Sequence, residues 1–170
     1  MEDIEIPTEH LHETIYEKAT ESHESGWFGY VAISTAFMAV FAAISGLIAG
    51  HYSNEALIEQ IQASDQWSYY QAKGIKAEIK ALQVKIGLVD ATAILKYKTE
   101  QEEIKKEAEK LQNESKFYLS KHVKLAQSVT LFQIAIAISA ISMLTKKKSL
   151  WLASLVISLT GLVFFIGGFI

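Results

Sequence analysis

The sequence predicts an all-α membrane protein: three transmembrane helices, with a long antiparallel, coiled-coil-like helical hairpin between the first and the second. Three observations predict this fold class. Half of the residues are hydrophobic, and most of these gather in three uncharged blocks. Small or apolar residues in the long polar section recur at alternating spacings of four and three, the pattern of a coiled-coil seam. Glycine and aspartate punctuate the middle of that section.

Residues 1–26 predict an acidic, amphipathic N-terminal helix. The first 25 residues carry eight acids against Lys18 alone. Pro7 and Thr8 mark its start, with Thr8 as the N-cap. Because a secretory signal peptide begins with a basic region, we expect the following apolar block to be a retained membrane span.

The three uncharged blocks, residues 27–50, 125–145 and 149–170, predict transmembrane helices. Each reaches or exceeds the roughly 20 residues that a helix needs to cross about 30 Å of hydrocarbon. The alternative is a soluble bundle, in which protein must cover every side of all three helices. About 100 residues remain for that purpose, so the sequence favours lipid as the surrounding.

Residues 51–124 predict an extramembrane helical hairpin with two seams. The first predicted seam comprises Ile58, Ile61, Asp65, Ser68, Ala72, Ile75, Ile79, Leu82, Ile86 and Val89. The second comprises Ile104, Ala108, Leu111, Ser115, Tyr118, His122 and Leu125, and it continues to Val129 and Phe132. Each seam is expected to face the other arm.

The chain is expected to reverse near residues 87–90. Gly87 suits a helix C-terminus and Asp90 suits an N-cap. A turn there leaves arms of similar length, each standing roughly 50 Å off the membrane. A turn at Gly74 would make one arm twice as long as the other. We expect the first and second spans to continue into the arms without a break, and a four-residue turn to follow the second span.

Sidedness rests on the short basic turn Lys146–Lys148. Basic residues in short loops favour the cytoplasm, so the turn is expected inside and the hairpin in the periplasm. Lysines at the other end of the second span, such as Lys121 and Lys124, weigh against this orientation.

The N-terminal segment holds the only metal hypothesis. His10, Glu13 and Glu17 would share one face of a helix, and imidazole with carboxylates binds divalent transition ions. A solvated acidic face opposite Leu11 and Ile15 explains the same pattern and is favoured. No cofactor is expected.

The spans contain no acid, lysine or histidine, which argues against a proton-coupled carrier. Gln127 and Gln133 are expected to hydrogen-bond between helices; alternatively, Gln133 lines a pore with Ser139 and Ser142. Small residues predict a close helix contact, made by the protein's own third span or by a second copy. They are Ala42, Gly46 and Gly50, and Gly161, Gly167 and Gly168 are candidates for the other half.

Catalysis is not predicted. The sequence has no cysteine, no phosphate-binding glycine loop, no metalloprotease helix and no nucleophile elbow. His51 and His122 are placed to face each other at the membrane ends of the arms, but no nucleophile accompanies them. Lysines and acids nearly balance in residues 51–124, which is unlike a nucleic-acid-binding surface.

The stretch SDQWSYYQAKGIK places aromatic residues in a polar section. If Asp65 and Ala72 face the other arm, Trp67 and Tyr70 point away from it and form an interface. Alternatively, the register shifts locally and Trp67 packs against the return arm near Leu111. The membrane boundary does not explain Trp67, which lies roughly 25 Å along the helix from Gly50.

The segments LIAGHYSNEALIEQIQASDQWSYYQAKGIK and LFQIAIAISAISMLTKKKSLW resemble the domain of unknown function 4337 family, and so does the PTEHLHE opening. The resemblance implies a small bacterial integral membrane protein with no established activity. It also implies importance for the residues in its most specific part, which are Asp65, Gln66, Trp67, Tyr70, Gln71 and Lys73.

These observations together predict a non-enzymatic protein of the bacterial inner membrane. We expect a homo-oligomeric scaffold, or an assembly that binds an unidentified protein partner through the projecting hairpin. The alternative is a small oligomeric channel.

Overall fold

The computed structural model describes residues 26–87 and 92–170, and this part of the chain is helical without strands. Helix α2 spans Gly26–Lys85, α3 spans Thr92–Thr145 and α4 spans Lys148–Gly167. All three are long and apolar enough to cross a membrane. The predicted all-helical class and the predicted number of candidate spans are therefore confirmed.

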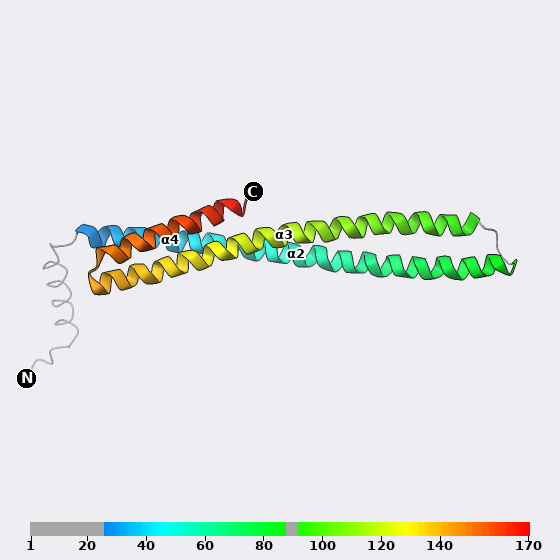
Figure 1. The fold of residues 1–170 in the computed structure, drawn as a ribbon, viewed down its shortest axis with the longest axis horizontal. Coiled ribbons are helices and arrows are strands. Elements are labelled where there is room, and N and C mark those ends of the chain that lie inside the picture. Colours follow the sequence, from blue (N-terminus) through cyan, green and yellow to red (C-terminus); the bar gives the residue numbers. More distant parts are fainter. Residues whose placement is uncertain (1–25, 88–91) are drawn as a thin grey trace, which may run out of the picture.

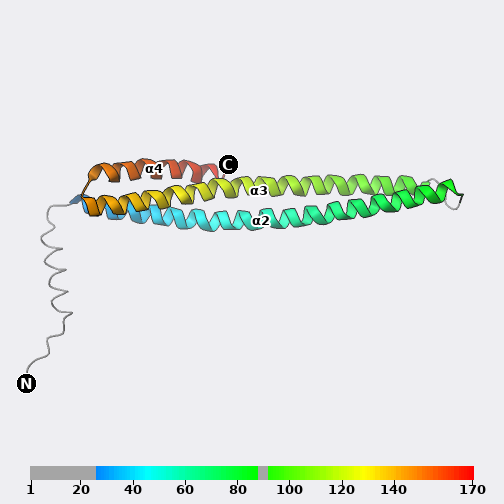
Figure 2. The same ribbon diagram turned by 60° about the horizontal axis from the view of Figure 1, so that its bottom comes forward.

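Helices α2 and α3 lie side by side in opposite directions and form a thin rod (Figures 1 and 2). Helix α2 has 60 residues, which corresponds to about 90 Å. Helix α4 lies along the apolar half of the rod only (Figure 1). Both long helices pass from the apolar half into the polar half without interruption, as the sequence predicted. We call residues 51–85 of α2 and 92–124 of α3 the stalk.

A residue with positive φ lies at the turn at each end of the rod. Gly87 has φ 77°, and its N–H donates to the Val84 carbonyl at 3.0 Å just after α2 ends. Between α3 and α4 only Lys146 and Lys147 are non-helical, so this turn is shorter than the predicted four residues. Lys146 takes φ 53°, and the Lys147 N–H reaches back to the Ser142 carbonyl at 3.2 Å.

Most of the hydrophobic surface of the apolar half is not covered by protein. In the most apolar 18-residue window of each helix, only 17%, 28% and 11% of residues are buried for α2, α3 and α4 respectively. The core is a small cluster around Met38, Phe132 and Ala135. Large side chains such as Phe37, exposed by 63%, point outward. A soluble bundle would bury them, so this surface suits lipid rather than water.

In the stalk, the face of α2 that contacts α3 is not the predicted one. The buried residues of α2 here are Ala56, Ala63 and Ala77, continuing Ala49 and Ser45 from the apolar half. The predicted seam residues from Ile58 to Ile86 are all exposed. Alanine allows the two backbones to approach closely, whereas a row of isoleucines would hold them apart. We call the observed row, Ala49, Ala56, Ala63 and Ala77, the inner seam.

The predicted seam of α3 is confirmed. Ala108 and Leu125 are fully buried, Leu111 and Ser115 are buried, and Phe132 is exposed by only 1%. Ile104, Tyr118, His122 and Val129 are partly buried along the same row. The larger residues of α3 therefore fill the space that the alanines of α2 leave open.

Helix α4 packs mainly on α3, and it meets α2 through a few side chains, such as Trp151 with Ser34 and Trp27. A Cβ on Gly161 would lie 3.3 Å from Leu131 Cβ, and one on Gly168 would lie 2.6 Å from Leu125 Cγ. Gly161 and Gly168 thus serve a contact with the second span, whereas Gly167 does not. The sequence suggested that these glycines pack against Ala42, Gly46 and Gly50, and they do not.

Candidate functional site

Side chains of α3 bond directly to backbone carbonyls of α2 along the stalk. Ser115 Oγ donates to the Ala56 carbonyl at 2.8 Å, and His122 Nδ1 lies 2.8 Å from the Ala49 carbonyl. Further out, Gln101 Nε2 donates to the Tyr70 carbonyl at 3.4 Å. The number of residues between successive bonded positions is the same on α2 as on α3, so the register of the two helices is constant along the stalk. Small residues on α2 leave room for these side chains: Ala49 and Ala56 carry two of the carbonyls, and Gly74 makes room for Gln101 beside the Tyr70 carbonyl.

The densest polar contact in the described stalk joins Lys73 of α2 to α3. Lys73 Nζ donates to the Glu100 carboxylate. The ammonium also lies 5.3 Å from the centroid of the Tyr69 ring and 5.5 Å from that of Tyr97, both at cation–π distance. We call Tyr69, Tyr70, Lys73, Tyr97, Glu100 and Gln101 the cross-arm cluster.

The charges in the cross-arm cluster shift each other's pKa. The hydrogen bond to Glu100, and then that to Tyr69, raise the pKa of Lys73 above its ordinary 10.5. The hydrogen bond from Lys73 lowers the pKa of Glu100 below its ordinary 4.5. Both groups are therefore charged together across the neutral range.

The predicted interface residues divide between two faces of α2. Gln66, Trp67, Tyr70 and Lys73 are partly buried, whereas Asp65 and Gln71 are exposed. The side chain of Lys73 is only 15% exposed. Tyr70 and Lys73 contact α3, so the prediction that Tyr70 points away from the other arm is wrong. The cause is the choice of seam, since Tyr70 follows Ala63 and precedes Ala77 by seven residues each.

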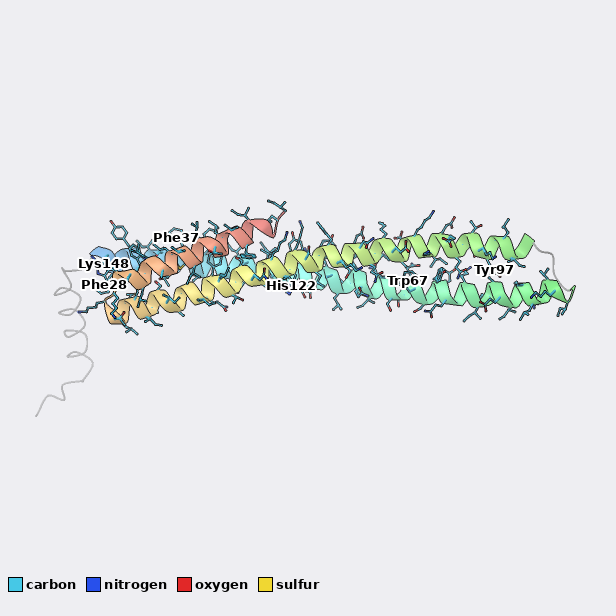
Figure 3. The ribbon with its side chains drawn as sticks, in the orientation of Figure 1. Phe28, Phe37, Trp67, Tyr97, His122 and Lys148 are labelled. Atoms are coloured by element: carbon cyan, nitrogen blue, oxygen red, sulfur yellow. The ribbon has the colours of Figure 1, made fainter. Side chains whose placement is uncertain are left out.

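Trp67 packs within its own helix against Tyr70, with ring centroids 5.5 Å apart in an edge-on arrangement. It lies on the polar half of the rod (Figure 3). Gly74 provides room for Gln101, because a Cβ there would lie 2.7 Å from Gln101 Nε2. Tyr70 and Lys73 thus take part in the contact between the arms, whereas Gln71 and Ala72 between them are exposed.

The sequence did not single out the α3 half of the cluster. Tyr97, Glu100 and Gln101 lie in a helix rich in charges, where a single acid carries little information. Residues equally far from the turn on each arm are expected to meet in an antiparallel pair of helices. Lys73 lies 14 residues before Gly87, whereas Glu100 lies 10 residues after Asp90, so counting from the predicted turn misses this contact by about one helical turn.

Hydroxyl groups join the three helices in the apolar half. Thr35 Oγ1 and Ser139 Oγ are 2.6 Å apart, and Ser128 Oγ donates to the Gly161 carbonyl at 2.9 Å. Trp151 Nε1 donates to Ser34 Oγ at 3.1 Å. Such bonds satisfy polar groups that lipid would leave unpaired.

The residues predicted as polar glue or pore lining do not come together. Gln127 and Gln133 are exposed on α3. Ser139 and Ser142 are fully buried in the three-helix part. The three predicted pore residues, Gln133, Ser139 and Ser142, therefore share no open face within one chain. Ser139 bonds to Thr35 of α2, and Ser142 Oγ donates to the Ser139 carbonyl within α3.

The predicted small-residue contact is used only in part. Ala42 packs against the core cluster. A Cβ on Gly46 would lie 3.9 Å from Val129, and one on Gly50 would meet nothing within 4 Å. Gly46 and Gly50 are exposed, so most of this face remains open.

Aromatic and basic residues mark both ends of the apolar half. At one end Trp27 and Trp151 lie with ring centroids 6.4 Å apart, and Lys148 Nζ is 5.9 Å from the Trp27 ring. At the other end Tyr52 stacks on Tyr118 with centroids 6.0 Å apart. About 38 Å of helix separates Trp27 from Tyr52, which matches a bilayer with its interfacial zones.

Metal and histidine hypotheses find no support in the described residues, among which no group of three potential metal ligands gathers. His51 lies 3.9 Å from Glu55 of its own helix, while His122 bonds to Ala49. The two histidines do not pair, contrary to expectation. His10, Glu13 and Glu17 lie outside the described residues.

The family described as "Domain of unknown function (DUF4337)" matches residues 27–170. The resemblance noted in the sequence is thereby confirmed for this range, which includes the Asp65–Lys73 motif; the PTEHLHE opening lies outside it. No curated protein and no solved structure matches the chain.

Proposed function

We propose that the chain, which belongs to the family described as a domain of unknown function (DUF4337), is a non-enzymatic membrane scaffold. Its apolar half lies in the bacterial inner membrane, and its stalk projects into water. Several copies assemble, and the stalk serves as the surface for assembly or for binding a protein partner.

The observation that carries this proposal is the unbroken passage of α2 and α3 from the apolar half into the stalk. A rigid pair of helices transmits position over tens of ångströms, because a helix without a hinge bends little. The cross-arm cluster holds the two arms together far from the membrane (Figure 3). This arrangement supports a spacer or platform more readily than a catalyst.

The orientation that we propose places the Lys146–Lys148 turn in the cytoplasm and the stalk in the periplasm. The three lysines are consecutive and sit beside Trp27 and Trp151, at one end of the apolar half. At the opposite end, Lys121 is tied to the Phe169 carbonyl at 3.0 Å and covers the Phe117 ring. It is thus partly engaged with protein, which leaves the consecutive lysines as the stronger topological signal.

The copy number in lipid tests the scaffold proposal. The full-length protein is reconstituted in nanodiscs of phosphatidylethanolamine and phosphatidylglycerol, and its mass is measured by light scattering. We expect two or more chains per particle over a tenfold range of protein concentration. A single chain throughout that range would contradict a homo-oligomeric scaffold.

A pore assembled from several copies is the alternative function, and the burial of Ser139 and Ser142 gives it less support. Liposomes that contain the protein and a trapped fluorescent ion indicator distinguish the two functions. The scaffold is expected to leave ion leakage at the level of empty liposomes across salts and voltages. Leakage that depends on Gln133 would favour the pore.

A further inference from the structure

Helix α2 carries a second row of residues at alternating spacings of four and three, on the side away from α3. We call it the outer stripe: Ile58, Ile61, Asp65, Ser68, Ala72, Ile75, Ile79 and Leu82, together with Ile86 directly after the end of the helix. All of its members are exposed. The aliphatic ones are exposed by 46% at Ile58 and by up to 70% at Ile86. Because the stripe lies in the stalk, lipid does not explain it.

Helix α3 cannot cover the outer stripe. Five of the outer residues lie two positions from an inner-seam residue, as Ile61 does from Ala63 and Ile79 from Ala77, and the others repeat at the same spacing. Two positions correspond to about 200° around a helix. The inner seam is buried against α3, so the outer stripe faces the opposite side. Helix α2 therefore has two seams, and a single chain uses one of them.

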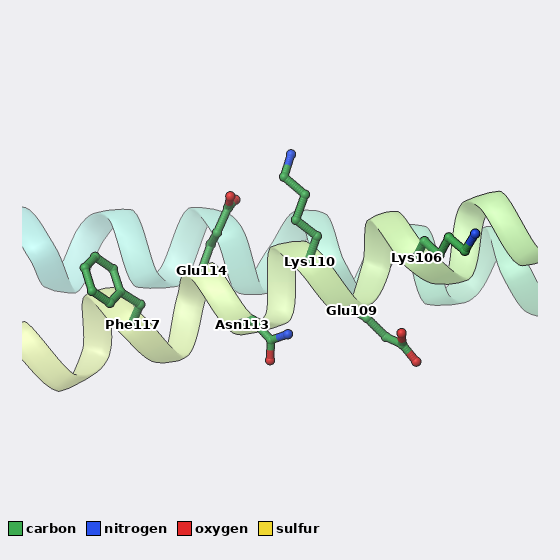
Figure 4. Close-up of a pocket in the computed structure, with 6 residues that line it drawn as sticks. All are labelled: Lys106, Glu109, Lys110, Asn113, Glu114 and Phe117. Atoms are coloured by element: carbon green, nitrogen blue, oxygen red, sulfur yellow. The ribbon is translucent and has the colours of Figure 1, made fainter.

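The outward face of α3 has a different character. Lys106, Glu109, Lys110, Asn113, Glu114 and Phe117 line a shallow groove that belongs to α3 alone (Figure 4). Lys110 Nζ lies 3.6 Å from Glu107 of the same helix. Charges of both signs, paired along one helix, mark a solvated surface. Of the two outward faces of the stalk, only that of α2 thus carries a regular row of exposed apolar residues.

The outer stripe continues into the apolar half as a row of small residues. They are Ala32, Ala36, Ala39, Ala43, Gly46 and Gly50, again at spacings of four and three, and all are exposed. At about 100° per residue they lie on the same side of α2 as the outer stripe. The covering partner must therefore run along α2 both in the membrane and in water. A soluble protein meets only the second requirement.

We propose that this partner is α2 of a second copy, parallel and in register. The inference deepens the proposed scaffold function and rests on it, because a common insertion direction makes two copies of α2 parallel. A twofold axis along the membrane normal then places each residue of the outer stripe against its own counterpart. The stripe supplies the isoleucine and leucine side chains that parallel coiled coils place at their core positions.

Cysteine cross-linking in membranes tests the contact, because the chain has no natural cysteine. Single variants Ile75→Cys, Ile79→Cys, Leu82→Cys and Ile86→Cys are oxidised before solubilisation. Their dimer bands are expected to exceed, by tenfold or more, those of two controls. Ala81→Cys lies off the stripe, and Leu95→Cys is 71% exposed on α3.

The outcomes separate this inference from the scaffold proposal. Cross-links that follow the spacing of four and three support the parallel dimer. Strong cross-links at Leu95→Cys together with weak ones on the stripe would overturn the α2 contact while leaving an oligomer. Weak cross-links everywhere, with single chains in nanodiscs, would overturn both proposals.

Asp65 provides a second test, which a loss of folding cannot mimic. In the parallel dimer two Asp65 carboxylates face each other, and like charges at a core position destabilise association. Asp65→Asn is therefore expected to raise the dimer fraction at least several-fold in dilution experiments in detergent. Asp90, outside the stripe, is replaced by Asn as the control. An unchanged or lower dimer fraction for Asp65→Asn would contradict the proposed pairing.

Discussion

Lys73 is the residue where the family motif acquires a physical role. Its ammonium contacts the Glu100 carboxylate and two tyrosine rings. The backbone carbonyl of Tyr70, three residues earlier, accepts a hydrogen bond from the Gln101 side chain. Three of these contacts, those with Glu100, Tyr97 and Gln101, cross between the arms and fix a single register, whereas Tyr69 lies on the same helix as Lys73. A slip by one turn would break all three at once.

Stability of the stalk is expected to depend on pH through this ion pair. The lowered pKa of Glu100 contributes stability above pH 4.5 that is lost as the pH falls through the lowered value. The raised pKa of Lys73 contributes stability below pH 10.5 that is lost as the pH rises through the raised value. The pair thus stabilises the fold fully between these limits.

Lys73→Met removes the pair and is expected to lower the Tm by roughly a few degrees at pH 7. Circular dichroism of the full chain in detergent provides the melting curves. At a pH low enough to protonate the Glu100 carboxyl in the folded protein, the variant and the natural protein should melt together. Lys76→Met, which alters an exposed lysine one turn away, is the control. A difference in Tm that does not shrink as the pH falls would rule out the ion pair as its cause.

At the scale of the element, small residues decide which helices touch. Gly168 and Gly167 are adjacent, yet only Gly168 lies against another helix, where Leu125 occupies the space of a missing Cβ. Leu125 is fully buried and cannot move aside. The two glycines therefore form a matched pair for testing how α4 is held.

Gly168→Ala is expected to destabilise the contact between α4 and α3 by about 1–3 kcal/mol, the usual effect of overpacking. Amide hydrogen exchange near the end of α4 measures it. Gly167→Ala should leave the exchange rates within experimental error, because nothing lies within 4 Å of its added carbon. Equal effects of the two variants would contradict the packing described.

The inner seam makes a similar prediction for the stalk. Ala63 and Ala108 are fully buried on facing helices. Ala63→Leu is expected to lower the free energy of unfolding by about 1–3 kcal/mol, because the added carbons force the backbones apart. Denaturation in mild detergent measures the change. Ser64→Leu, at an exposed position of α2 outside both the inner seam and the outer stripe, should be tolerated, and a larger loss there would contradict the packing of Ala63 against α3.

At the scale of the whole molecule, the three tryptophans report the position of the bilayer. Trp27 and Trp151 lie at one end of the apolar half, whereas Trp67 stands in the stalk about 25 Å beyond Gly50 (Figure 3). Single-tryptophan variants in liposomes are titrated with brominated lipid. We expect strong fluorescence quenching for Trp27 and Trp151 and little for Trp67. Strong quenching of Trp67 would contradict a projecting stalk.

Much of the architecture was readable in the sequence. The three uncharged blocks predicted the candidate spans, since apolar runs of this length have few other uses. The four-and-three spacing of α3 predicted its buried row correctly, because that helix has only one such row. Gly87 was chosen as a turn residue, and it has the positive φ that glycine adopts most easily.

The tertiary structure alone decided which side of α2 meets α3. Both the isoleucine row and the alanine row repeat at helical spacing, so periodicity could not choose between them. The alanine row faces α3 because alanine lets the two backbones approach each other. Ser115, His122 and Gln101 of α3 then reach backbone carbonyls of α2. That choice brought Lys73 to Glu100 and left the isoleucines facing outward. Side-chain volume and hydrogen bonding across the gap, rather than hydrophobicity along one helix, determined the pairing.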